Sequence, residues 1–215
     1  MLSKVIKNTF ATGHLLTWGQ TTYGWGRPNN GHPWTPGTVA NFNDIESVST
    51  GQYHLGFVTK DHSVYTVGLS DNGRLGQGNY SQSGTSALPG KISFGDSASI
   101  TSLSCGSRHT LALSSAGNVY SWGHPNTLGV IGVAKNDIPI LIPPESFQNQ
   151  KVVRIQAARD FSVALTEQNK LYVWGYGLSR IPKWEQQSLT PVISSEVEQL
   201  VHKRHAKIKK FFAIG

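Results

Sequence analysis

The chain has 215 residues, a single cysteine and a formal net charge of +7 at pH 7. This length is enough for one domain with a sizeable core. One cysteine, Cys105, excludes an internal disulfide framework and any zinc site built from several cysteines. No stretch approaches the roughly 18 to 20 uninterrupted apolar residues that a membrane-spanning helix needs.

The basic charge is confined to the two ends of the chain. Residues 1–43 contain three basic residues and no acidic one, and residues 201–215 contain five basic residues and no acidic one. The remaining body, residues 44–200, has 11 basic and 12 acidic residues and is therefore close to neutral. This distribution argues against a folded body that lies along nucleic acid, because such a body carries its cations on its own surface.

The first 13 residues have an amphipathic pattern. On a helix, one face would carry Leu2, Val5, Ile6 and Phe10 and the other Lys4 and Lys7. A basic, acid-free, amphipathic start is typical of mitochondrial targeting segments. The pattern predicts a short helical arm that is either an uncleaved targeting segment or a helix that docks on a partner. A short arm with chance periodicity is the alternative.

A unit of about 24 residues then occurs three times, at 45–68, 100–123 and 152–175. Each unit has apolar residues six and three places before a small hinge residue, which is Gly51, Gly106 or Ala158. A glycine closes each unit 17 residues after the hinge. Constant spacing inside the unit, with variable connections between units, is what a stacked supersecondary module produces.

The composition of each unit indicates β-structure. Short runs rich in Val, Leu, Tyr and Trp are separated by turn-forming residues, the pattern of strands joined by tight turns. Hairpin reversals are expected at 61–62, 116–118 and 168–169. Three strands per unit follow, and the proline-containing connection can supply a fourth. A four-stranded antiparallel module with this repeat length predicts a β-propeller blade.

Several spaced motifs resemble the repeats of the regulator of chromosome condensation family. They are G-x-x-H, A-L-S/T, V-Y-x-W-G and the turn G-R-L-G-Q-G at 73–78, and the full pattern is clearest in residues 105–123. The resemblance covers roughly residues 14–200 and implies a propeller. The third unit departs from the pattern at Ala158 and Phe161, and the first departs at Val67, which replaces the tryptophan.

The sequence predicts an all-β partial propeller of about four blade-like units, namely three full repeats plus terminal half-units, with short helical termini. Residues 14–19 match the third strand of a unit, while Phe212 and Gly215 match the first strand of another. We therefore expect an amphipathic arm at 1–13, propeller blades at 14–195 and a basic helix/strand segment at 196–215. The half-units would pair with each other or be completed by another chain, since exposed strand edges favour a partner that covers them.

No constellation for catalysis, metal binding or cofactor binding stands out. His54 and His109 occupy equivalent positions, but Phe161 takes the third, so a packing or hydrogen-bonding role is expected for the imidazoles. Cys105 is expected to fill a small core space. The glycines at 73–78 lack the ending of a phosphate-binding loop and predict a turn.

Large aromatic residues in the connections and the C-terminal basic cluster are the candidate partner-binding residues. They are Trp25, Trp34, Tyr80, Trp184, Lys203, Arg204, Lys207, Lys209 and Lys210. Aromatic side chains in loops often anchor protein interfaces, and packing within the loops is the alternative. The basic cluster fits an anionic lipid, a nucleic acid or an acidic protein face, and a solvated basic terminus is the alternative.

These features predict a non-catalytic interaction or scaffold module without cofactors, an accessory subunit of a larger assembly whose partners are other protein chains. The N-terminal arm favours a mitochondrial location, with cytoplasm or nucleus as alternatives. The family resemblance implies a second hypothesis, a guanine-nucleotide exchange factor whose partner is a small GTPase. A third is chromatin binding through the basic termini, which predicts a steep salt dependence of DNA affinity.

Overall fold

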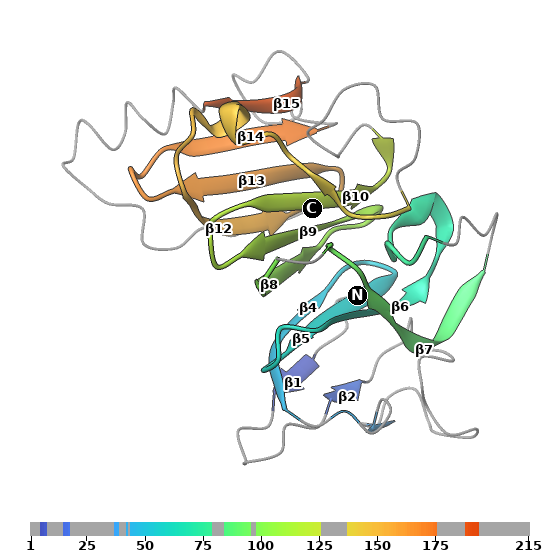
Figure 1. The fold of residues 1–215 in the computed structure, drawn as a ribbon. Helices are drawn as coiled ribbons and strands as arrows, with labels where there is room; N and C mark the ends of the chain where they lie inside the picture. The colour runs from blue at the N-terminus through green and yellow to red at the C-terminus, as the bar shows by residue number, and fades with distance from the viewer. Residues whose placement is uncertain are drawn as a thin grey trace.

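The computed structural model describes residues 42, 44–78, 84–95, 98–125, 137–175 and 188–193, and the backbone of residues 5–7, 15–17 and 37–38. The described strands form three four-stranded antiparallel sheets and one three-stranded sheet. These sheets follow one another in chain order, and Figure 1 shows them stacked side by side without closing into a ring. A partial propeller is therefore confirmed.

Each sheet is built from consecutive strands and is called here a blade, numbered in chain order. Blade 1 contains β1 (Val5–Lys7), β2 (Leu15–Thr17) and β3 (Gly37–Thr38). Blade 2 contains β4 (Ile45–Thr50), β5 (His54–Thr59), β6 (Val64–Leu69) and β7 (Thr85–Ile92). Blade 3 contains β8 (Ile100–Cys105), β9 (His109–Ser114), β10 (Val119–Gly123) and β11 (Ile140–Leu141). Blade 4 contains β12 (Val152–Ala157), β13 (Phe161–Thr166), β14 (Leu171–Gly175) and β15 (Ser188–Ile193).

The expected helix of the N-terminal arm is wrong at Val5–Lys7, which form strand β1 paired antiparallel with β2. Three residues are too few for a helical period and a strand alternation to be told apart, and pairing with a neighbouring strand decides the outcome. The expected boundaries at 13/14 and 195/196, and the predicted C-terminal helix, lie outside the described residues. The described helical segments are the 3-10 turns η1 (Asp71–Gly73) and η3 (Pro144–Phe147), and neither is long or apolar enough to cross a membrane.

Hairpin turns lie where the sequence predicts them. The residues that reverse the second and third strands include His62, Gly117 and Asn169, and all three have φ between 63° and 90°. Positive φ is available mainly to glycine and asparagine or aspartate, with histidine also enriched, which is why such residues occupy these turns.

The glycine that closes each unit is fixed by backbone conformation and by space. Gly68, Gly123 and Gly175 have φ of 124°, 116° and 117°. A Cβ atom at Gly123 would also overlap the backbone of the opposite strand at Arg108 and His109. Both constraints admit only glycine, so the constant 17-residue spacing from the hinge reflects the register between the second and third strands.

The hydrophobic core lies between blades. One cluster joins blade 2 to blade 3, and its members are Val58, Val64, Ile92, Ile100, Leu103, Ala112 and Trp122. A second cluster joins blade 3 to blade 4, with Leu111, Leu113, Val119, Val152, Ala157, Ala164 and Trp174 among its members. Trp122 and Trp174, which occupy equivalent positions in the repeat, are both fully buried. A third cluster lies within blade 2. Blades 2 to 4 thus bury part of their apolar surface against their neighbours.

The turn at 73–78 folds back on blade 2 and opens no helix. Gly73, Gly76 and Gly78 have φ between 69° and 73°, as the turn prediction requires. The Thr66 hydroxyl donates to the Leu75 carbonyl at 2.6 Å, which holds the turn against β6. This places the side chain of Arg74 between blade 2 and blade 3.

Candidate partner-binding face at the hinge loops

The loops that join the first and second strands are called hinge loops here and comprise residues 51–53, 106–108 and 158–160. Each begins with the same tight turn, in which the hinge N–H donates to the carbonyl three residues later. The distances are 2.8 Å for Gly51 to His54, 2.9 Å for Gly106 to His109 and 2.8 Å for Ala158 to Phe161. All three hinge loops therefore present their next two side chains at the same end of the blades.

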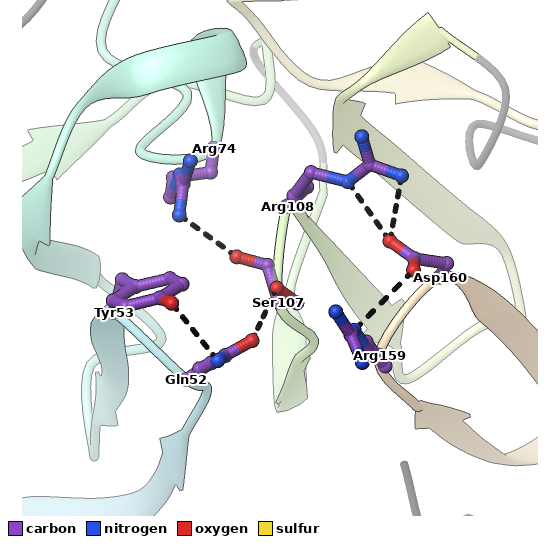
Figure 2. Close-up of polar contacts among 7 residues, drawn as sticks. All are labelled: Gln52, Tyr53, Arg74, Ser107, Arg108, Arg159 and Asp160. Atoms are coloured by element: carbon purple, nitrogen blue, oxygen red, sulfur yellow. Dashed lines mark hydrogen bonds and ion pairs between the residues drawn. The ribbon is translucent and has the colours of Figure 1, made fainter.

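Hydrogen bonds join these loops sideways from blade to blade. The Gln52 N–H donates to the Gly106 carbonyl at 3.2 Å, and the Ser107 N–H donates to the Arg159 carbonyl at 3.1 Å. The Ser107 hydroxyl also donates to the Gln52 side-chain oxygen at 2.6 Å. The loops consequently form one connected surface, whose side chains are shown in Figure 2.

A serine on the first strand of blades 2 and 3 supports the first strand of the next blade. The Ser49 hydroxyl accepts from the Cys105 N–H at 2.9 Å, and the Ser104 hydroxyl accepts from the Ala157 N–H at 2.7 Å. Each bond satisfies a backbone donor of the following first strand. Gln156 occupies the same position in blade 4.

The two histidines lie directly beneath the face and join neighbouring blades. His54 Nε2 lies 2.6 Å from the Thr110 hydroxyl oxygen, and His109 Nε2 lies 2.8 Å from that of Ser162. The Thr110 hydroxyl donates to the Arg74 carbonyl, so it accepts from His54, whose Nε2 must carry the proton. The hydrogen-bonding role expected for these imidazoles is therefore confirmed.

Burial keeps both imidazoles neutral. It lowers the pKa of His54 to about 3, with a smaller lowering by the charge of Arg74. It also lowers the pKa of His109 to about 3. Cys105 is likewise enclosed, and burial raises the pKa of its thiol to about 12. The neutral imidazoles and the protonated thiol act as packing and hydrogen-bonding groups under the face.

Arg74, from the turn after blade 2, lies between blades 2 and 3 with only 3% of its surface exposed. Its Nε donates to the Asp71 carbonyl at 2.7 Å and its Nη1 donates to the Ser107 carbonyl at 2.9 Å. The Arg74 carbonyl in turn accepts from Nε1 of Trp122 at 2.9 Å. The guanidinium carbon lies 5.6 Å from the centre of the Tyr53 ring, a cation–π distance.

Blades 3 and 4 are joined on the face by charged side chains. Asp160 Oδ1 accepts from Nε of Arg108 at 2.8 Å and lies 2.8 Å from Nη2 of the same guanidinium. Its other oxygen lies 3.7 Å from Nε of Arg159. Figure 2 shows Asp160 between the two arginines. Arg159 reaches furthest into solvent, with 63% of its side chain exposed.

The face thus combines an aromatic ring and two guanidinium groups on three successive blades, all fixed by hydrogen bonds or ion pairs. Tyr53 is 39% exposed, and the side chains of Arg108 and Arg159 are 34% and 63% exposed. Tyrosine and arginine are among the side chains most often found at the energetic centres of protein interfaces. Such a surface is suited to recognition, because little side-chain freedom is lost when a partner binds.

Sequence reasoning missed these residues. The signal was that the two positions after each hinge vary between units while their surroundings repeat, as in Gln52-Tyr53, Ser107-Arg108 and Arg159-Asp160. The predicted partner-binding residues all lie outside the described residues, and their role stays a prediction. They are Trp25, Trp34, Tyr80, Trp184, Lys203, Arg204, Lys207, Lys209 and Lys210.

Comparison with known proteins gives the chain's relatives. The signature described as "Regulator of chromosome condensation (RCC1) repeat" matches residues 61–113, and a second signature of the same description matches residues 100–129. The ultraviolet-B receptor UVR8 of Arabidopsis thaliana is 31% identical over 173 residues, which are 77% of this chain and 38% of that protein. Human regulator of chromosome condensation is 30% identical over 69% of this chain and 36% of its own length.

A mitochondrial relative is also found, the RCC1 domain-containing protein RUG3 of Arabidopsis thaliana. It is 31% identical over 61% of this chain and 29% of its own length. The chain therefore spans between about a quarter and two fifths of the length of these curated relatives.

Solved structures show the same fold. Human WBSCR16 superposes with a TM-score of 0.73 at 22% identity, covering 89% of this chain and 50% of that one. Yeast RCC1 (Prp20), solved bound to Kap60, gives a TM-score of 0.73 at 21% identity, covering 86% and 46%. The repeat signatures, the order of the motifs and these superpositions all indicate the stacked blades that the inter-blade contacts join. The chain belongs to the regulator of chromosome condensation (RCC1) repeat family.

Proposed function

We propose that this chain is a non-catalytic interaction module, an accessory subunit that binds another protein through the hinge-loop face. The observation that carries the proposal is the presence of Tyr53, Arg108 and Arg159 on three successive blades at one end of the sheets. No single loop supplies this surface.

Protein–protein binding suits the chemistry of this face better than catalysis. The groups under it that serve elsewhere as bases or nucleophiles are His54, His109 and Cys105, and all three are buried. Their pKa values are displaced by burial to about 3 for the imidazoles and about 12 for the thiol, away from the neutral range in which acid–base catalysis is efficient.

Relatives support protein partners in general terms. The yeast protein Prp20 was solved bound to Kap60, and a second structure of Prp20 was described together with its binding properties to Gsp1p and histones. We extend to this chain only the class of ligand, another protein chain. A mitochondrial site of action is part of the proposal, supported by the basic N-terminal segment and by the similarity to the mitochondrial protein RUG3.

Site-specific photocrosslinking tests the role of the face. A photoreactive phenylalanine analogue replaces Tyr53 in one variant and Lys170, a residue of the hairpin turn in blade 4, in a matched control. A crosslinked protein identified only with the Tyr53 probe is then purified, and its affinity is measured. We expect Tyr53→Ala and Arg159→Ala to weaken that complex at least ~5-fold and Lys170→Ala to leave it unchanged.

Equal loss in all three variants, or no loss in any, would show that the partner binds elsewhere. Circular dichroism melts of each variant separate loss of binding from loss of folding.

A further inference from the structure

We infer that the partner of the hinge-loop face is an acidic protein segment, which presents carboxylates to Arg159 and Arg108 and accepts a hydrogen bond from Tyr53. This inference rests on the proposed function and names the chemistry of its partner. It is carried by the charges and donors that meet on the face.

Arg74 contributes positive charge beneath the face. Its guanidinium is buried and bonded to two carbonyls, and among the described residues no carboxylate lies within 4.0 Å of it. Carbonyl oxygens satisfy its donors, and the charge of Asp71 offsets part of the guanidinium charge from beyond that distance. A buried charge is screened less by water than an exposed one, so Arg74 adds positive charge beneath the Tyr53 ring.

Arg108 and Arg159 contribute the exposed positive charge of the face. Asp160 holds Arg108 with two nitrogens at 2.8 Å but lies 3.7 Å from Arg159. One carboxylate is therefore shared by two guanidinium groups, and the contact to Arg159 is the longer one. Arg159 is also the more exposed of the two, so it has donors that remain available to an incoming carboxylate.

The Tyr53 hydroxyl is both an acceptor and a donor. It accepts a hydrogen bond from the Gln52 side-chain amide at 3.0 Å. A phenol oxygen that accepts in this way keeps its own proton to donate. Since Tyr53 is partly exposed, that proton faces the same solvent as the arginine donors, and an acceptor-only group such as a carboxylate satisfies all of them.

The opposite end of blade 2 has no such excess of positive charge among its described residues. Lys60 lies 3.1 Å from Asp44, and hydrogen bonds from Thr59 and Ser63 lower the pKa of the neighbouring Asp61 to about 2. The positive charge of Lys60 is therefore balanced by carboxylates of the same blade. Within blade 2, charge complementarity thus favours the hinge-loop end for an acidic partner.

Binding of model peptides to the purified chain tests this chemistry. The probes are a fluorescein-labelled peptide of about 12 residues with six glutamates and a counterpart with six lysines, followed by fluorescence anisotropy at about 50 and 150 mM salt. We expect the acidic peptide to bind more tightly, and we expect Arg159→Ala to weaken it roughly tenfold, the scale of a lost charge-assisted contact. Lys170→Ala removes one positive charge from the other end of the blades and is the matched control.

The Asp160→Asn variant gives a prediction of opposite sign. It removes the carboxylate that competes for Arg108 and Arg159, so affinity for the acidic peptide should rise severalfold. Tyr53→Phe should lower it about threefold, the loss of one hydrogen bond. Weaker binding in Asp160→Asn, tighter binding of the lysine peptide, or equal losses in Arg159→Ala and Lys170→Ala would overturn the inference.

The two proposals fail in different ways. If photocrosslinking at Tyr53 yields a partner whose affinity depends on Arg159 while the peptides bind equally, the face is an interface and its partner is not acidic. If the acidic peptide depends on Arg159 but no protein crosslinks at Tyr53, the charge complementarity is real and the proposed function is wrong.

Discussion

The imidazole Nε2 of His109 in blade 3 lies 2.8 Å from the hydroxyl oxygen of Ser162 in blade 4, and both side chains are fully buried. The same pair recurs one blade earlier between His54 and Thr110. This hydrogen bond crosses the boundary between two blades. Because hydrogen bonds depend on angle as well as distance, it helps to set the orientation of one blade against the next as well as contributing to stability.

Removing the Ser162 hydroxyl should destabilise the fold. Ser162→Ala leaves a buried imidazole nitrogen without its partner, which costs about 1 to 3 kcal/mol. His109→Phe should cost a similar amount, and the double variant less than the sum, because each single change already breaks the bond. Urea unfolding followed by tryptophan fluorescence measures all three. Ser115→Ala, an exposed hydroxyl in the next turn, should leave the midpoint unchanged, and additive single effects would contradict the link.

Acid should destabilise the protein through the same histidines. Burial lowers the pKa of His54 and His109 from 6.5 to about 3, so below pH 6.5 the unfolded chain binds protons that the folded chain does not. The stability that the two neutral histidines contribute is fully present above pH 6.5. It is lost as the pH falls towards 3, by up to about 1.4 kcal/mol per pH unit for each histidine.

Urea midpoints at about pH 7.5 and 4.5, on either side of the unfolded-state pKa, measure this loss. The His54→Gln/His109→Gln variant carries side chains that do not titrate, so its midpoint should change less between the two pH values. An equal change in the variant and the natural chain would assign the acid sensitivity to other groups.

Gly106 should not tolerate a side chain. A Cβ atom there would overlap the Ala158 carbonyl oxygen of the next blade and crowd the His109 ring. We expect Gly106→Ala to cost about 1 to 3 kcal/mol by overpacking. The reverse change, Ala158→Gly, should cost at most about 1 kcal/mol, chiefly from backbone entropy. Thermal melts compare the two, and equal costs would show that the hinge position has no inter-blade constraint.

Lysine should not replace Arg74. The guanidinium spans two carbonyls, Asp71 and Ser107, which a single ammonium group cannot reach with the same geometry. Arg74→Lys should therefore lower stability by about 1 to 3 kcal/mol. Arg154→Lys, an exchange at an exposed position of β12, is the matched control for thermal melts. If both variants have the same melting temperature as the natural chain, Arg74 does not join the blades.

Much of the fold follows from spacing inside the repeat. The strands of blades 2 to 4, their hairpins and the closing glycines depend on residues close in sequence, whose turn chemistry and register leave a periodic pattern. Strand β1 differs from the predicted helix, because Val5–Lys7 is too short for its own pattern to outweigh pairing with β2.

The hinge-loop face could not be predicted in the same way. Arg74 and Ser107 are 33 residues apart, and Arg108 and Asp160 are 52 apart, so these contacts arise only when blades stack. Residues that differ between units leave no periodic signal, and the difference is what gives Tyr53, Arg108 and Arg159 their separate roles. The sequence favoured large aromatic residues in the connections, because residue type alone indicates which side chains often bind partners. It does not indicate where the fold places them.

The link between a histidine and the next blade's hydroxyl also limits which blade can follow a histidine-bearing one. Blade 3 can follow blade 2 because Thr110 accepts from His54, whereas blade 2 carries Leu55 at the matching position. A duplicated blade 2 placed after itself would set a leucine against His54 and leave its buried N–H unpaired. Although the units look interchangeable, a blade can follow a histidine-bearing blade without this loss only if it carries a hydroxyl at that position, as blade 3 does with Thr110 and blade 4 with Ser162.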